Sequence, residues 1–186
     1  MKYLITNLLL AVGFMSYAQA EDPRRTYQTA SIDGEVPVID GRLDDPAWEQ
    51  VDWAGDFIQR QPVDGAAPSQ QTQFKILYDA KYLYIGIRAF DTEPDKVVRR
   101  MSRRDGFEGD FVEVNIDSYA DKRTAFSFSA SASGVKGEEY ISNNGENWDA
   151  TWDPIWYLKT SLDELGWIAE FKIPLSQLRF ADKESH

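Results

Sequence analysis

The sequence contains no cysteine, a single histidine and only a short N-terminal hydrophobic run. Without cysteine, the chain can form neither disulfides nor thiolate metal or redox sites. Axial haem ligands would have to come from Met101 or His186, which argues against a haem protein. The apolar run from Tyr3 to Phe14 is shorter than the about 20 residues that a membrane-spanning helix requires.

Positive charge is also scarce, because 20 basic residues face 31 acidic ones and the formal net charge is -11. This balance disfavours a phosphate backbone or an anionic membrane surface as a partner, so we expect no nucleic-acid binding. The one basic cluster comprises Arg99, Arg100, Arg103 and Arg104 and is followed by acidic residues. We interpret it as solvated surface paired with nearby carboxylates.

The first twenty residues have the form of a secretory signal. They combine Lys2, the apolar run and the small-x-small sequence Ala18-Gln19-Ala20. We therefore expect residues 1–20 to be removed and the protein to be exported to the periplasm, the outer membrane or the medium. Removing 20 of 186 residues leaves 166, the size of one domain. We expect a leader over residues 21–35 and one domain over residues 36–186.

The start of this domain predicts a strand and a helical turn. Residues 36–39 are mostly apolar and precede an Asp-Gly turn, which indicates a short strand. Asp44 or Asp45 then stands before Pro46, the order expected of a helix N-cap with proline at the first helical position. A turn of helix should cover residues 47–51 and bury Trp48, and residues 60–71 should form a surface loop.

From Thr72 onward, apolar residues recur with a period of two, which is typical of strands. Residues 72–78 and 82–89 read as a hairpin with a turn over 79–81, and residues 111–117 read as a further strand. Residues 155–160 and 167–173 form a last pair, and Pro174 opens a short helical turn. Many short strands with little helix predict an all-β protein, an antiparallel β-sandwich with one or two short helical turns.

The segment from Thr124 to Ser133 has one apolar face and one face of small hydroxylated residues, Ser127, Ser129, Ser131 and Ser133. We interpret the serine face as a solvated sheet surface. The alternative is that these small side chains leave room for a bulky polar ligand.

The stretch NWDATWDPIW holds three of the six tryptophans, Trp148, Trp152 and Trp156. Pro154 disfavours a helix through all three, which would cost about 3 kcal/mol or more. In an extended chain, the three indoles point to the same side. Trp156 should be buried because a strand follows it. The other two lie near Asn and Gly residues typical of a loop, so they form either a stacking platform for a ligand or part of the core.

Stacking alone would not hold a ligand. Aromatic contacts contribute about 0.5–1.5 kcal/mol each beyond burial of area. Three would supply about 3 kcal/mol, whereas a millimolar complex needs about 4 kcal/mol. A working site therefore needs hydrogen-bonding partners, and the candidates are Glu113, Asn115, Asn147 and the serine face.

Six motifs in order give the chain a family resemblance. They are VPVIDGRLDDPAW, TQFKILYDAKYLYIGIRAFD, MSRRD, GDFVEVNID, DKRTAFSFSASASG and GWIAEFKIPLSQLRF. This series resembles the family 9-like carbohydrate-binding modules, and most closely the version at the N-terminus of exported bacterial proteins with a C-terminal outer-membrane-type β-barrel. The resemblance covers residues 36–180 and implies that a further strand after them completes the sheet, so that the chain is a fragment of a longer protein.

The resemblance implies a β-sandwich that binds a carbohydrate without catalysis. In the best-studied relatives, two tryptophans grip a terminal sugar, polar side chains bind its hydroxyls and structural calcium lies nearby. Carried over by motif, Glu113 takes the acidic strand position, Trp148 or Trp152 takes one stacking position and Phe107 takes the other. Relatives that bind ligands carry arginine and asparagine where this chain has Ser127, Ser129 and Ser131.

Two further hypotheses about function accompany the leading one. The domain could serve as a docking module of an outer-membrane barrel, its only link to a membrane, with a decayed sugar site. It could instead be a glycoside hydrolase, with an acid–base pair drawn from Asp110, Glu113 and Glu170. Calcium requires oxygen ligands, and Asp110 and Asp117 are the candidates, although they match no fixed-spacing calcium loop.

Overall fold

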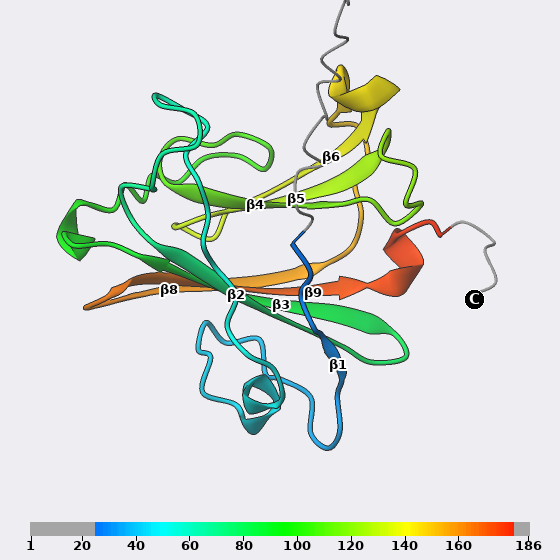
Figure 1. The fold of residues 1–186 in the computed structure, drawn as a ribbon, viewed down its shortest axis with the longest axis horizontal. Helices are drawn as coiled ribbons and strands as arrows, with labels where there is room; N and C mark the ends of the chain where they lie inside the picture. The colour runs from blue at the N-terminus through cyan, green and yellow to red at the C-terminus, as the bar shows by residue number, and fades with distance from the viewer. Residues whose placement is uncertain (1–24, 181–186) are drawn as a thin grey trace, which may run out of the picture.

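The computed structural model describes residues 25–180, which form two β-sheets packed face to face (Figure 1). One sheet contains, in spatial order, β1 (Ala30–Ser31), β2 (Thr72–Tyr78), β3 (Tyr82–Phe90), β9 (Gly166–Pro174) and β8 (Tyr157–Asp163). The other contains β4 (Phe111–Ile116), β5 (Ala125–Ser131), β6 (Lys136–Ser142) and β7 (Asn147–Asp149). Apart from the parallel pair β1–β2, the neighbouring strands are antiparallel, and the predicted β-sandwich is confirmed.

Helix is confined to four short 3₁₀ turns in the described residues, rather than the one or two expected. They are η1 (Pro46–Gln50), η2 (Pro94–Lys96), η3 (Asn143–Gly145) and η4 (Leu175–Gln177). Within residues 25–180, no helix has the length and hydrophobicity needed to cross a membrane.

Both predicted hairpins are present with the expected turns. In the β2–β3 hairpin, Tyr78 pairs with Leu83, and the Asp79 carboxylate accepts hydrogen bonds from the backbone N–H groups of Lys81 and Tyr82. In the β8–β9 hairpin, Asp163 pairs with Gly166. Period-two alternation therefore located these strands correctly.

The main core lies between the two sheets. Ile85, Phe128 and Phe171 are buried there with Trp156, whose ring stacks on Phe171 at a centroid distance of 5.3 Å. The predicted burial of Trp156 is confirmed.

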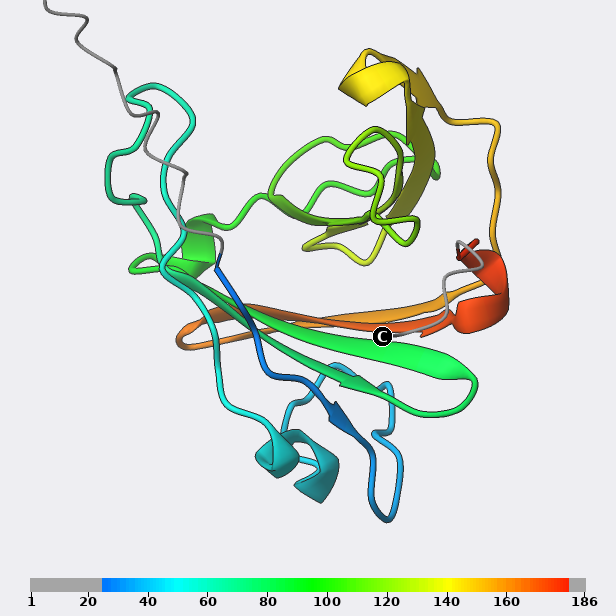
Figure 2. The same cartoon turned by 45° about the vertical axis from the view of Figure 1, so that its right-hand side comes forward.

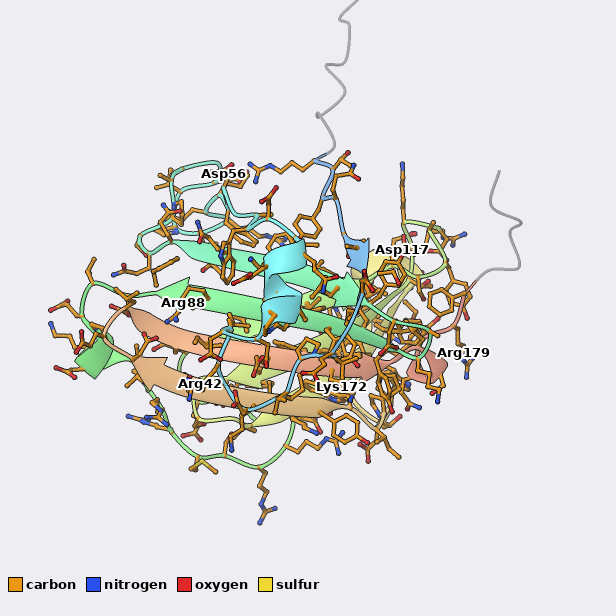
Figure 3. All side chains as sticks on the ribbon, turned by 90° about the horizontal axis from the view of Figure 1, so that it is seen from below. Arg42, Asp56, Arg88, Asp117, Lys172 and Arg179 are labelled. Carbon is orange, nitrogen blue, oxygen red and sulfur yellow. The ribbon has the colours of Figure 1, made fainter. Side chains whose placement is uncertain are left out.

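A second apolar cluster covers the opposite face of the five-stranded sheet, where the N-terminal segment and η1 lie across the strands (Figures 2 and 3). Trp48 is buried there, as predicted, and packs with Leu43 directly over Gly86, where a β-carbon would lie only 2.5 Å from the Leu43 side chain. Tyr27 and Ala30 also pack here, so part of the stretch interpreted as a leader contacts the sheet.

The strand expected over residues 36–39 is wrong, because no neighbouring strand binds its backbone. The Val38 N–H donates instead to the Asp45 carboxylate at 3.1 Å, which leaves η1 without the predicted side-chain cap. The next turn is held by Glu170, whose Oε2 accepts the N–H groups of Asp40, Gly41 and Arg42. Residues 36–42 are therefore held by hydrogen bonds to side chains and not by backbone hydrogen bonds to a neighbouring strand.

One edge of the sandwich is open beside β4. Among the described strands, β4 pairs only with β5, and a cavity of about 470 Å³ lies next to it between the sheets. Its walls are mainly apolar and include Phe74, Ile85 and Val112. The prediction that a further strand completes this sheet stays a prediction.

Candidate ligand-binding face

The register of the four-stranded sheet brings most of the predicted site residues onto its outer face, the face turned away from the main core. Three rows of cross-strand neighbours define it. These rows are Glu113–Ser129–Gly137, Asn115–Ser127–Glu139 and Ala125–Ile141–Trp148. Since cross-strand neighbours share a face, Glu113, Asn115 and Trp148 project on the same side of the sheet. We call this surface the outer face.

The serines of β5 form the floor of this face and are not solvated. Ser127, Ser129 and Ser131 are 1%, 5% and 4% exposed, so the solvated-surface interpretation is wrong. Their side chains are short, whereas β4 and β6 on either side carry longer ones, including the exposed Glu113 and Asn115. The result is a low central strand flanked by taller side chains, and the alternative that this face leaves room for a bulky polar ligand stays a prediction.

An aromatic pair closes one end of the outer face. The ring of Phe107 lies against Gly137 so closely that a β-carbon there would be 2.4 Å from two ring atoms. Phe107 also stacks on the half-exposed Phe111, with centroids 5.3 Å apart and planes inclined by 29°. The glycine therefore allows the 99–110 loop to place an aromatic ring on the sheet.

Trp148 stands at the other end. It pairs with Ile141 on β6, is 45% exposed, and donates its indole N–H to the Gly145 carbonyl at 2.9 Å. Ile141 is four residues from Gly137 along β6, a distance of about 13 Å at a strand rise of about 3.3 Å per residue. Trp148 and Phe107 are thus separated by more than one sugar ring, with the polar rows between them.

Trp152 does not join Trp148, and the prediction that the three indoles share one side is wrong. Trp152 packs on the core side of the sheet, with ring centroids 4.9 Å from Phe126 and 5.4 Å from Phe128. The chain changes direction after β7, where the Asp149 carboxylate accepts hydrogen bonds from the N–H and hydroxyl of Thr151. Because of this turn, Trp148 and Trp152 do not lie on one continuous extended strand, and their side chains point to different sides of the sheet.

Asn147 also lies off the outer face. It precedes Trp148 in β7 and so projects to the opposite side of the strand, where its amide donates to the Ser142 hydroxyl at 3.1 Å. Of the predicted polar partners, Glu113 and Asn115 are therefore brought together with Trp148 and Phe107, and Asn147 is not.

The polar side chains of the outer face are linked and acidic. Glu113 accepts hydrogen bonds from the Asn115 amide at 2.7 Å and from the Ser129 hydroxyl at 3.3 Å. Burial raises the pKa of Glu139, and the negative charges of Glu113 and Asp105 raise it further. The carboxylates of Glu113 and Asp105 therefore act on Glu139 at this surface.

Glu139, Asp105 and Phe111 were missed as site residues. Glu139 lies on β6, whose sequence KGEEYIS lacks a clean alternation because Glu138 occupies a core-facing position. A strand at this position could have been inferred from the apolar pair Tyr140-Ile141, which follows a turn at Gly134. Phe111 could have been found, because it precedes Glu113 by two residues and shares its face.

The metal candidates hold backbone turns. Asp110 accepts a hydrogen bond from the Val98 N–H at 2.7 Å, and Asp117 accepts the N–H groups of Asp121 and Lys122. Between residues 25 and 180, no three or more His, Asp or Glu side chains are arranged to hold a metal ion. Asp110 and Asp117 thus have structural partners that explain their presence.

Glu113 and Glu170 cannot act as a glycosidase pair. Glu113 lies on the outer face of one sheet, and Glu170 is fully buried on the far face of the other, under the residue 40–42 turn. Packed sheets are about 10 Å apart, and these side chains point in opposite directions from the sandwich. Their separation therefore exceeds the about 5–9.5 Å over which paired carboxylates cleave a glycoside.

Fold and face together define a β-sandwich domain in which aromatic rings lie at the two ends of a polar floor. The chain belongs to the family described as carbohydrate family 9 binding domain-like, whose model matches residues 39–186. Membership in this family of binding modules bears out the expectation that the domain is not an enzyme. A comparison with curated proteins found no match.

Solved structures share the fold at low sequence identity. A family 9 carbohydrate-binding module from Caldicellulosiruptor kristjanssonii, in complex with glucose, is 23% identical with a TM-score of 0.56, over 80% of this chain and 70% of that one. The same module in complex with cellotriose gives the same values over 68% of its chain. A candidate carbohydrate-binding protein from Bacteroides uniformis is 14% identical with a TM-score of 0.60, over 81% of this chain and 73% of that one.

Proposed function

We propose that this domain binds a carbohydrate on the outer face, between Trp148 at one end and Phe107 at the other. The observation that carries the proposal is the strand register, which sets both rings and the Glu113–Asn115 pair on one surface. Family membership and the sugars in the complexes of the Caldicellulosiruptor module support it.

The chemistry of the face suits a sugar. Aromatic rings stack on the apolar faces of sugar rings, and the carboxylate and amide between them can accept and donate hydrogen bonds to hydroxyls. Ser127 and Ser129 are too short to obstruct a ring lying over β5. The floor thus admits the ligand, and the longer side chains on either side fix its orientation.

The test is affinity electrophoresis and calorimetry with cello-oligosaccharides and a glycan panel, using wild type and Trp148→Ala. We expect Trp148→Ala to weaken binding by at least tenfold. Trp53→Ala is the matched control, because Trp53 is 39% exposed but lies outside the outer face, against Lys75. Equal affinity in wild type and Trp148→Ala, or equal losses in both variants, would contradict the proposal.

We also propose that the protein is exported, on the basis of the signal-like residues 1–20, which lie outside the described part of the chain. Expression of the full chain in a bacterium, followed by fractionation and N-terminal sequencing, tests this. Cleavage after Ala20 is the expected result, and an uncleaved cytoplasmic product would contradict it.

A further inference from the structure

The outer face has more negative charge than a neutral sugar requires. Glu113 and Glu139 stand on either side of the β5 serines, and Asp105 lies at the adjoining edge of β6, where it accepts a hydrogen bond from the Glu138 N–H. None of the ion pairs found between residues 25 and 180 includes any of these three carboxylates.

Four basic side chains on neighbouring elements have other partners or lie at the far end of this face. Arg104 pairs with the core-facing Glu138 and with Asp153, and Lys136 donates to the Trp156 carbonyl. Lys122 and Arg123 lie beyond Asn115, at the Asp117 end of the face. Glu113 is exposed and Glu139 is partly buried, and neither forms an ion pair with a Lys or Arg of the described chain.

A buried hydroxyl below them also lacks a partner. Ser127 lies between Asn115 and Glu139 in the middle row, is 1% exposed, and its Oγ makes no hydrogen bond among the described residues. An unsatisfied buried hydroxyl costs free energy, so a polar ligand group that reaches it gains more than a solvated contact would give. The floor and the carboxylates thus call for a donor-rich ligand.

A sugar amine fits this combination. A protonated amine carries three donors and a positive charge, whereas a hydroxyl offers one donor and an acetamido group offers one donor without charge. Placed between Glu113 and Glu139, it would relieve the repulsion between like charges and form charge-assisted hydrogen bonds. A uronate would add a fourth negative charge at the same place.

We propose that the outer face selects amino sugars with a free amine, with Glu113 and Glu139 binding the ammonium group. This inference rests on the proposed carbohydrate site and names its ligand class. Trp148 and Phe107 supply stacking that is indifferent to charge, and the two carboxylates decide between cationic, neutral and anionic sugars of the same ring shape.

The experiment compares, at pH 6 and 150 mM salt, glucosamine oligomers, N-acetylglucosamine oligomers, cello-oligosaccharides and galacturonate oligomers of equal length, by calorimetry. We expect the free-amine oligomers to bind at least tenfold more tightly than the neutral ones and the galacturonates not to bind. Glu139→Gln should remove the preference for amines, so that free-amine and neutral oligomers of equal length bind this variant with affinities within about threefold of each other.

The matched control is Glu164→Gln, an exposed residue of the β8–β9 turn whose loss changes the net charge equally. It should keep the preference, which separates the site from general attraction to an acidic protein. Equal affinity for amino and neutral sugars, or an unchanged preference in Glu139→Gln, would overturn this inference and leave the proposed function standing. Absence of binding to every glycan would overturn both.

Discussion

The ring of Phe107 rests on the backbone of Gly137, at a distance that no β-carbon could share. This contact connects the 99–110 loop to the first turn-proximal residues of β6 and places the aromatic pair at one end of the outer face. It also explains why β6 contains a glycine next to two glutamates. Gly137 lacks a side chain, and this leaves space for the ring of Phe107.

We therefore predict that Gly137→Ala displaces Phe107 and weakens sugar binding. The added methyl would lie 2.4 Å from Cε2 and Cζ of the ring, so the ring must move. Binding, measured by calorimetry, should fall about as far as in Phe107→Ala, and the free energy of unfolding should fall by about 1–2 kcal/mol.

The double variant is the control for this prediction. If Gly137→Ala acts through Phe107, the pair Gly137→Ala, Phe107→Ala should bind no more weakly than Phe107→Ala alone. Additive losses of binding would show that the glycine contributes in another way.

Trp148 and Trp152 should differ in what their removal does. Trp152→Ala deletes a ring packed on Phe126 and Phe128, and we expect a loss of about 2–4 kcal/mol in the free energy of unfolding, because the ring is only partly buried. Trp148→Ala removes a ring that is 45% exposed and should cost less than about 1 kcal/mol. Urea denaturation measures both, and equal losses would contradict their placement on opposite faces.

The sequence predicted the strands that can be recognised from the apolar residues within the strand itself. In β2, β3 and β4 the residues that pack on the main core recur at every second position, as Phe74 and Ile76, Leu83 and Ile85, and Val112 and Val114 do. The burial of Trp48 and Trp156 also followed from their neighbours in the chain.

Features that depend on distant residues were not predictable. The alternation of β6 fails because Glu138 is accommodated in the core by Arg104 and Trp156, and Gly137 accommodates Phe107. The shared side expected of Trp148 and Trp152 failed because the Asp149 carboxylate closes a turn between them. In both cases a contact made by a side chain changes the pattern that the period of two residues would predict.

The Arg104–Glu138 ion pair gives the next prediction. Glu138 is 2% exposed and its Oε2 accepts the Arg104 Nε hydrogen bond at 2.8 Å, while its Oε1 accepts the Trp156 indole N–H. Arg104→Ala would leave a buried carboxylate without its cation, which we expect to cost about 2–3 kcal/mol, since the arginine itself is 41% exposed. Chemical denaturation measures the loss.

Arg103→Ala is the matched control, because Arg103 is an exposed neighbour outside every ion pair found in residues 25–180. Its removal should change the free energy of unfolding by less than about 0.5 kcal/mol. If both variants lost the same stability, the cluster would act as general surface charge.

Glu170 should make the stability of the domain depend on pH. It is fully buried, and burial raises its pKa to about 7, while hydrogen bonds from the Gly41, Asp40 and Arg42 N–H groups act in the opposite direction. Its Oε1 has no hydrogen-bond partner among the described residues. The folded protein therefore keeps the proton at pH values where the unfolded chain, with a glutamate pKa near 4.5, has released it.

Between pH 4.5 and 7, the folded state binds one more proton at this site than the unfolded state, so its stability decreases as the pH rises. At about 1.4 kcal/mol per pKa unit, this contribution is of the order of 3 kcal/mol. Glu170→Gln keeps an acceptor for the three N–H groups but cannot titrate, so it should lack this decrease. Glu49→Gln, exposed in η1, should retain it. Parallel pH profiles of unfolding free energy in wild type and Glu170→Gln would show that Glu170 does not hold its proton on folding.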